Sequence, residues 1–131
     1  MQIGDTFEVQ DTVTEQKTAA SLGSGALPVF GTPFLAAMME NAAFTLMQRD
    51  LPEGKSSVGV KLDIAHVSPS PIGMTVRAVA EVTAISENGK MVDFKVTGYD
   101  GAGLIGEGTH QRAIINVERF MDKCESKLKE S

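Results

Sequence analysis

The sequence predicts an α+β fold in which a curved antiparallel β-sheet wraps around one central α-helix. Residues 34–49 contain strong helix formers and no breaker, and they are apolar on nearly every side, which is typical of a buried helix. From Ser57 onward, apolar residues recur at every second position, which is typical of strands. The Asn88-Gly89 pair marks a hairpin, and successive hairpins join antiparallel neighbours.

The helix and the strands follow one another in a simple order. Thr32-Pro33 predicts the helix start, with the Thr32 hydroxyl as N-cap and Pro33 at the first helical position. The other expected elements are a first strand over 3–13, a small-residue loop over 18–31, strands over 57–66, 74–85, 91–99 and 104–117, and a short charged helix from Glu118. The loop has room for one short helical turn, and it is either a plain connector or a lid over a site.

The composition describes one small acidic domain over residues 1–131. The 17 acidic and 12 basic side chains give a net charge of −5, which argues against nucleic acid or an anionic membrane as a partner. No stretch reaches the ~18 apolar residues of a membrane span. Cys124 is the only cysteine, so no intramolecular disulfide or thiolate metal cluster is expected. Because the first residues carry no secretory signal, we expect a cytoplasmic protein.

The predicted sheet suggests self-association. A single sheet of long strands leaves unpaired backbone groups at its edges, and pairing edge to edge with a second copy covers one of them. We therefore expect a homodimer, or a dimer of dimers. A chain of 131 residues is small for an enzyme that encloses its substrate, and a partner chain would complete such a pocket.

Two polar residues on the predicted helix are candidates for a site. Glu40 stands among apolar neighbours, where it belongs either to a solvent-facing stripe with Asn41 or to a partly buried site, because buried carboxylates need partners. Thr32 is either only a helix cap or a member of the same site. Being eight residues apart, Thr32 and Glu40 lie about 80° and two turns from one another, so a pocket along the N-terminal half of the helix meets both.

Three strand residues are further candidates, each with a structural alternative. His66 continues the apolar face of its strand and is either a satisfied strand-end histidine or part of a site. Gly59 predicts either a bulge or a close approach of backbone to a ligand, with its N–H as donor, and the Gly106–His110 stretch has the same two interpretations. Arg112 is either a solvated strand residue or a binder of phosphate or carboxylate. Two histidines on separate strands form no metal signature, and the chain has no dinucleotide fingerprint or nucleophile elbow.

Five short stretches occur together in a recognisable order: Val29–Phe34 (VFGTPF), Met38–Glu40 (MME), Val58–Val60 (VGV), Ala65–His66 (AH) and Gly108–Ala113 (GTHQRA). They resemble the hotdog-fold acyl-CoA thioesterases, in the branch typified by fluoroacetyl-CoA thioesterase. The likeness runs from about residue 3 to about residue 122, which is almost the whole chain.

The resemblance implies a hotdog fold that dimerises into one continuous sheet, with active sites near the dimer interface. The positions that match the family's functional residues are Thr32, Glu40 and His66 as the catalytic set, and Phe30, Gly59 and Arg112 as substrate-binding residues. The resemblance further implies a small or medium acyl-CoA thioester as substrate. It implies no metal, and no cofactor beyond the coenzyme A that forms part of the substrate.

One stretch departs from the family pattern. The fluoroacetyl-specific enzyme has aromatic lid residues shortly before its catalytic Thr, whereas residues 22–27 contain none here. We therefore expect general acyl-CoA hydrolysis rather than fluoroacetyl selectivity. Two other functions stay open, a non-catalytic acyl-CoA binder and a hotdog enoyl-CoA hydratase, although the Asp-x-Asn-Pro-x-His stretch of such hydratases is absent. The sequence leaves Glu40 as either general base or nucleophile, and it assigns no role to His110 or Cys124.

Overall fold

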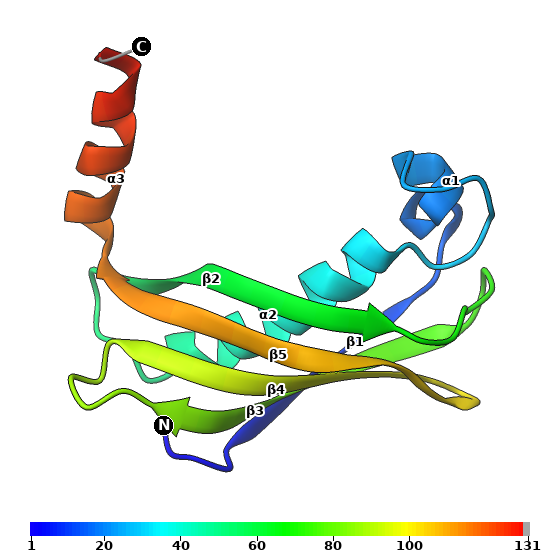
Figure 1. Ribbon diagram of the computed structural model, residues 1–131, viewed down its shortest axis with the longest axis horizontal. Helices are drawn as coiled ribbons and strands as arrows, with labels where there is room; N and C mark the ends of the chain where they lie inside the picture. The colour runs from blue at the N-terminus through cyan, green and yellow to red at the C-terminus, as the bar shows by residue number, and fades with distance from the viewer. Residues whose placement is uncertain (130–131) are drawn as a thin grey trace.

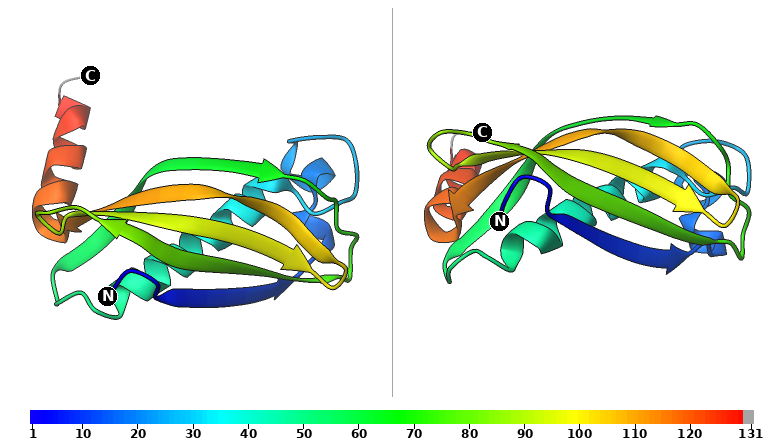
Figure 2. Two further views of the ribbon diagram at one scale, coloured as in Figure 1. Left: turned by 60° about the horizontal axis from the view of Figure 1, so that its bottom comes forward. Right: turned by 90° about the horizontal axis from the view of Figure 1, so that it is seen from below.

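A five-stranded antiparallel sheet curves around one long helix, α2 (Thr32–Gln48), in the computed structural model, which describes residues 1–129 (Figure 1). The strands are β1 (Thr6–Thr12), β2 (Lys55–His66), β3 (Thr75–Ile85), β4 (Met91–Asp100) and β5 (Gly103–Asn116). Their order across the sheet is β1-β3-β4-β5-β2, so β1 and β2 form the two edges (Figure 2). The predicted α+β class is confirmed. Residues 130 and 131 of the predicted domain lie outside the described residues.

Shorter elements lie at the two ends of the molecule. A 3-10 turn, η1 (Glu15–Lys17), follows β1, and α1 (Ala19–Leu22) is the short helical turn for which the loop over 18–31 was predicted to have room. At the other end, α3 (Val117–Ser126) leaves β5 and projects away from the sheet, and η2 (Lys127–Lys129) follows it (Figure 1). None of the helices within residues 1–129 combines the length and the apolarity needed to cross a membrane.

The core lies between α2 and the inner face of β3 and β4. Small residues on β3 and larger ones on β4 alternate inward with a period of two, which allows the helix to pack closely on the sheet. The buried apolar residues of these three elements are Leu35, Met39, Ala42, Ala43, Leu46 and Met47 on α2, Val76, Ala78, Ala80 and Val82 on β3, and Val92, Phe94 and Val96 on β4. Most sides of α2 are covered, as a helix so rich in apolar residues predicts, and Pro33, Ala37 and Asn41 lie on its exposed side.

Gly31, and not Thr32, is the N-cap of α2. Its backbone is extended, with φ −77° and ψ 136°, and its carbonyl oxygen accepts hydrogen bonds from the N–H groups of Phe34 and Leu35. A side chain at this position would meet the backbone of Ala19, since a Cβ would stand 3.2 Å from the Ala19 nitrogen. Thr32 therefore begins the helix itself, and its hydroxyl is free to bind elsewhere.

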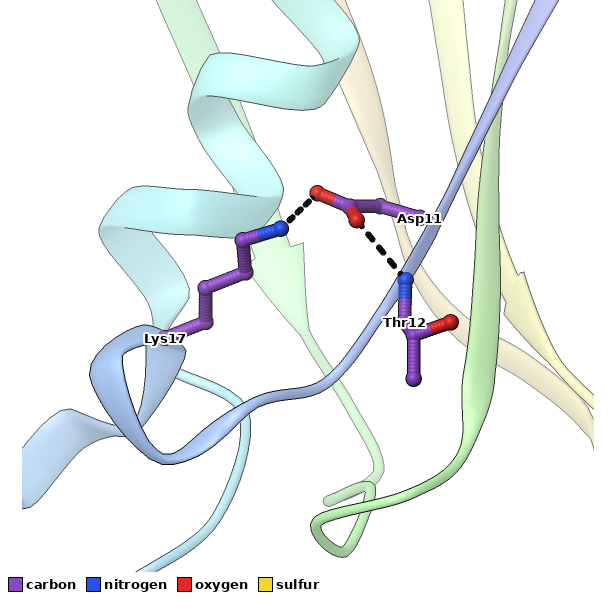
Figure 3. Close-up of polar contacts among 3 residues, drawn as sticks. All are labelled: Asp11, Thr12 and Lys17. Atoms are coloured by element: carbon purple, nitrogen blue, oxygen red, sulfur yellow. Dashed lines mark hydrogen bonds and ion pairs between the residues drawn. The ribbon is translucent and has the colours of Figure 1, made fainter.

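An ion pair between β1 and η1 supports the start of α2. The Lys17 ammonium group contacts the Asp11 carboxylate, whose other oxygen accepts a 2.8 Å hydrogen bond from the Thr12 N–H (Figure 3). The carbonyl oxygen of Lys17 in turn accepts the N–H of Gly31 at 2.9 Å. The contact thus connects an edge strand to the residue that caps α2.

A bulge in β2 shifts the phase of its side chains. The register with β5 runs from Gly59 opposite Arg112 directly to Lys61 opposite Gln111, which leaves Val60 as an extra residue. The predicted uninterrupted alternation, with Val60 inward and Gly59 outward, is therefore wrong. Gly59 faces α2, and Val60 is 54% exposed.

Glycines on β4 and β5 let the backbone and α2 approach closely. A Cβ at Gly98 or Gly106 would stand 2.7 or 2.8 Å from a methyl group of Leu35. At Gly108, it would stand 2.0 Å from the carbonyl oxygen of Asp63 on β2. The neighbours of Gly106 and Gly108 are thus protein atoms, so these two glycines serve packing rather than the approach of a ligand.

We predict that Gly108→Ala destabilises the protein by at least the upper end of the ~1–3 kcal/mol that overpacking typically costs, because the added methyl group displaces the β2 backbone. Gly101→Ala is the matched control, since its Cβ would meet only the Met74 sulfur at 3.4 Å. Urea denaturation of the two variants measures the difference. Equal free energies of unfolding would contradict the prediction.

Candidate active site

A cleft of about 560 Å³ opens between the N-terminal end of α2, the C-terminal end of β2 and the segment that precedes α2. Its lining residues are Ala19, Ser24, Val29, Phe30, Thr32, Pro33, Ala36, Leu62, Ile64, His66, Val67, Ser68 and Pro69. Three of the predicted site residues, Phe30, Thr32 and His66, therefore share one cavity. Ala19 and Ser24 belong to the segment predicted as a connector or lid, so this segment borders the site.

Thr32 and His66 form the polar pair of this cleft. The Thr32 hydroxyl and the His66 Nδ1 are 2.8 Å apart, within hydrogen-bonding distance. The pairing joins the first turn of α2 to the last residue of β2, as the sequence analysis placed them. Phe30 is buried below, with its ring edge-on to the imidazole at 6.3 Å between centroids.

The environment of His66 favours the neutral imidazole. Burial lowers the pKa of His66 below its ordinary value, and the nearby backbone of Ser68 opposes this only in part. Its Nε2 atom is buried and has no hydrogen-bond partner among residues 1–129. A neutral imidazole with one unpaired nitrogen can donate or accept a proton from a molecule bound in the cleft.

Glu40 lies farther along α2, against Gly59. The point where a Gly59 Cβ would stand is 3.0 Å from Glu40 Oε2, 3.4 Å from His110 Cε1 and 3.6 Å from Arg112 Nη1. The two interpretations of Gly59 therefore both hold in part: it borders the bulge, and it allows a close approach. The group that approaches is the Glu40 carboxylate, and a larger residue at position 59 would displace it.

The three predicted catalytic residues and Gly59 thus lie as two pairs along the interface between α2 and β2, and of these pairs Thr32 and His66 line the cleft. Thr32 and Glu40 are separated by about 12 Å of helix rise, with Ala36 between them on the same side of α2. On β2, His66 lies opposite Thr32, and Gly59 lies opposite Glu40. Within residues 1–129, no hydrogen bond joins Glu40 to Thr32 or His66, so one chain does not assemble a hydrogen-bonded triad.

Arg112 is buried rather than solvated, with 7% of its surface exposed. Its Nε donates to the Ser57 hydroxyl at 2.9 Å and its Nη2 to the Ser57 carbonyl oxygen at 3.0 Å, while Nη1 lies 3.2 Å from His110 Nε2. The guanidinium also lies over the ring of Phe44, 5.7 Å from its centroid. Burial lowers the pKa of Arg112, and the negative charge of Glu40 opposes this. The Arg112 guanidinium therefore lies inside the protein near Glu40, and not on the surface as a binder of phosphate would.

The sequence analysis did not assign His110, Ser57 or Phe44 to the site. His110 and Ser57 each lie two residues from a predicted member, Arg112 and Gly59, on the same strand. Since side chains two apart on a strand share a face, this spacing was the signal for both. Phe44 follows Glu40 by one helical turn.

Two further features lie outside this constellation. Cys124 is exposed on α3 and does not line the cleft. In the described part of the chain, no group of three or more His, Cys, Asp or Glu side chains is placed to hold a metal ion.

Comparison with known proteins identifies the family to which this constellation belongs. The model of the family described as fluoroacetyl-CoA-specific thioesterase matches residues 13–118. The chain belongs to this family. Among its relatives, the fluoroacetyl-CoA thioesterase of Streptantibioticus cattleyicolor is 32% identical over 133 residues, which is 97% of this chain and 94% of that protein. Membership makes the chain a thioester hydrolase of the acyl-CoA class.

Solved structures of the fluoroacetyl-CoA-specific thioesterase family share the fold. A structure of the fluoroacetyl-CoA thioesterase itself superposes with a TM-score of 0.90, at 32% identity and with 97% of each chain covered. A phenylalanine-to-alanine variant of that enzyme, in complex with fluoroacetate and CoA, superposes with a TM-score of 0.85 at 32% identity, covering 92% of this chain and 99% of that one. A Thermus thermophilus member of the thioesterase superfamily gives 0.87 at 27% identity, over 98% and 93% of the two chains. The predicted hotdog fold is therefore confirmed.

We predict that the free energy of unfolding falls as the pH is lowered from about 7.5 to 5.5. Burial lowers the pKa of both His66 and His110 below the ordinary 6.5, so the unfolded chain binds more protons than the folded one in this range. Urea denaturation across the range measures the slope. In the double variant with both histidines changed to Gln the slope should flatten, because carboxylates of lowered pKa, such as Asp11 and Asp100, act only below about pH 4. An equal slope in both proteins would contradict the assignment.

Proposed function

We propose that the protein hydrolyses a small or medium acyl-CoA thioester to the free acid and CoA, with Glu40 as general base or nucleophile. The observation that carries the proposal is the arrangement along the α2–β2 interface, where Thr32 pairs with His66 in the cleft and Glu40 lies against Gly59 farther along α2. Family membership supplies the reaction class. Side chains and water suffice for this chemistry, so no cofactor is required besides the CoA of the substrate.

In the proposed reaction, Glu40 removes a proton from a water molecule, whose oxygen bonds to the thioester carbonyl carbon. The Gly59 N–H stabilises the oxyanion that forms, and the carbon–sulfur bond then breaks. Neutral His66, held by Thr32, accepts the proton that Glu40 took from water and passes it to the departing thiolate, so that both side chains are regenerated and the acid and the CoA thiol are the products. In the alternative route, Glu40 attacks the carbonyl carbon itself, and water hydrolyses the resulting anhydride.

The surroundings of the cleft support hydrolysis of acyl-CoA esters without fluoroacetyl selectivity. The segment beside the cleft, residues 22–27, contributes small and aliphatic side chains, and its Leu22 and Leu27 are exposed rather than packed over the cavity. Phe30 is the aromatic ring of the cleft. Residues 22–27 therefore provide no aromatic lid for this cleft.

We further propose that the enzyme is a homodimer paired through β2. This strand is an edge of the sheet, and Val60 and Val67 expose apolar surface on it or directly after it. In an antiparallel β2–β2 pair, the His66 end of one strand lies beside the Gly59 end of the other. Such a dimer would bring Thr32 and His66 of one protomer close to Glu40 of the second, which one chain alone does not achieve.

Glu40→Gln should lower kcat by about 10²-fold or more, because an amide neither takes a proton from water nor attacks a thioester. Release of free thiol from a panel of straight-chain acyl-CoA esters and fluoroacetyl-CoA measures activity and chain preference together. Asn41→Ala, on the exposed neighbouring position, is the matched control. A wild-type protein that binds these esters without releasing thiol would overturn hydrolysis in favour of a non-catalytic binder. Single turnover in labelled water separates the two roles, since only the anhydride route labels the Glu40 carboxylate.

The shared site predicts complementation between two inactive variants. When Glu40→Gln and His66→Gln chains are mixed after dissociation and reassociation, each heterodimer should contain one intact site and one doubly altered site. Random pairing of a symmetric dimer then restores about a quarter of the wild-type activity. Thiol release from the mixture, compared with each variant alone, measures this. If Glu40 works with His66 of its own chain, the mixture stays as inactive as its components.

A further inference from the structure

The hydrogen bonds of His110 fix its protonation state. Its Nδ1 lies 2.8 Å from the carbonyl oxygen of Lys61, which only accepts, so Nδ1 carries the proton. Its Nε2 lies 3.2 Å from Arg112 Nη1, which only donates, so Nε2 holds the lone pair. His110 is therefore the neutral Nδ1–H tautomer and is not a free acid or base for catalysis.

His110 connects the β2 bulge to Arg112, the two features that surround Glu40. Lys61, whose carbonyl it binds, directly follows the extra residue of the β2 bulge, and this bulge turns Gly59 inward. Arg112, from which it accepts a hydrogen bond, lies with Glu40 around the same point above Gly59. His110 has 3% of its surface exposed, and its ring lies beside that of Phe94 at 6.2 Å between centroids with a tilt of 30°, so packing and hydrogen bonds both fix its position.

We propose that His110 is a positioning residue for thioester hydrolysis: as a neutral tautomer, it holds the Arg112 guanidinium and the Gly59 bulge in register beneath the Glu40 carboxylate. The inference rests on the proposed function of Glu40 and extends it to a residue that acts through Arg112. Arg112 has five N–H donors, of which Ser57 and His110 bind three. These three hydrogen bonds fix the orientation of the guanidinium plane, and with it the directions of the two remaining N–H groups.

The charges around His110 oppose its protonation. Arg112 on β5 and Glu40 on α2 are the charged groups that face the ring, and the Arg112 cation and burial lower the pKa of His110 while Glu40 and the Lys61 carbonyl raise it. A proton on Nε2 would point one donor at another and place two cations in contact. Replacing Arg112 should therefore raise the pKa of His110 and allow a proton on Nε2, while the Lys61 carbonyl still holds the proton on Nδ1.

Nitrogen-15 NMR of the imidazole tests the tautomer without any turnover. The chain has two histidines, so a His66→Gln background leaves His110 as the single signal. We expect protonated Nδ1 and unprotonated Nε2 through the neutral range. In the further variant Arg112→Met, the pKa of His110 should rise, so that Nε2 becomes protonated at a higher pH while Nδ1 keeps the proton that the Lys61 carbonyl accepts. A protonated Nε2 in the presence of Arg112, or a spectrum that Arg112→Met leaves unchanged, overturns the proposal.

Kinetics test whether the position matters for the reaction. His110→Phe keeps the ring but loses both hydrogen bonds, and should lower kcat by about 10-fold to 10²-fold with little change in KM, which is the scale of a ~1 Å misplacement. His110→Gln, which retains one donor and one acceptor, should recover most of the loss. In the Arg112→Met background, His110→Phe should add little, because both changes act through the same guanidinium.

The controls separate this inference from the function on which it rests. Thr109→Val, on the exposed side of the same strand, should leave kcat unchanged. Wild-type kcat in His110→Phe, or losses that multiply in the double variant, would show that His110 does not act through Arg112. A wild-type protein without thioesterase activity would refute the proposed function instead, and NMR would still decide the tautomer.

Discussion

The extra residue in β2 is the constraint on which the rest of the site depends. Side chains alternate strictly along a strand, so without the bulge at Val60, Gly59 and His66 would point to opposite faces of the sheet. With it, Gly59, Leu62, Ile64 and His66 all face α2. The helix contacts this strand at two places, where Thr32 binds His66 and where Glu40 lies against Gly59. The position of each candidate catalytic group therefore follows from one local break in pairing, which the hydrogen bond from His110 to Lys61 stabilises.

The two pairs along the α2–β2 interface differ in charge. At one end, His66 is half-buried and hydrogen-bonded to a neutral hydroxyl, and among residues 1–129 it has no charged partner. At the other, a carboxylate and a guanidinium lie close together under partial burial, where their attraction is screened less than at the surface. Ser57, His110 and Phe44 satisfy the guanidinium, which offsets the cost of removing it from water. Burial keeps the His66 imidazole neutral at one end, and the hydrogen bonds of the guanidinium hold the geometry of the other.

Much of the fold was predictable because hydrophobic periodicity and turn residues are local signals. The helix over α2, the strands from β3 to β5 and the short turn of α1 follow from them. The sequence did not show which residue of β2 is unpaired, because the pairing with β5, and not the neighbours along β2, decides this. Thr32 was assigned to the cap for a similar reason: a hydroxyl at a helix start has two uses, and only the position of His66, 34 residues later, selects one. Thr32, Glu40 and His66 stood out as polar residues in apolar patterns, whereas Ser57 and His110 gained meaning only from Arg112.

The segment between α1 and α2 has a kinetic consequence. Small and aliphatic side chains border the cleft there, and no aromatic ring from residues 22–27 packs over it. An enzyme closed by a bulky gate spends part of each cycle opening it, and release of product then sets its turnover. On the proposed function, no aromatic ring of residues 22–27 has to move before the acid and the CoA leave. We therefore expect the bond-breaking step to limit the rate, so that a more reactive thioester is consumed faster in proportion to its intrinsic reactivity.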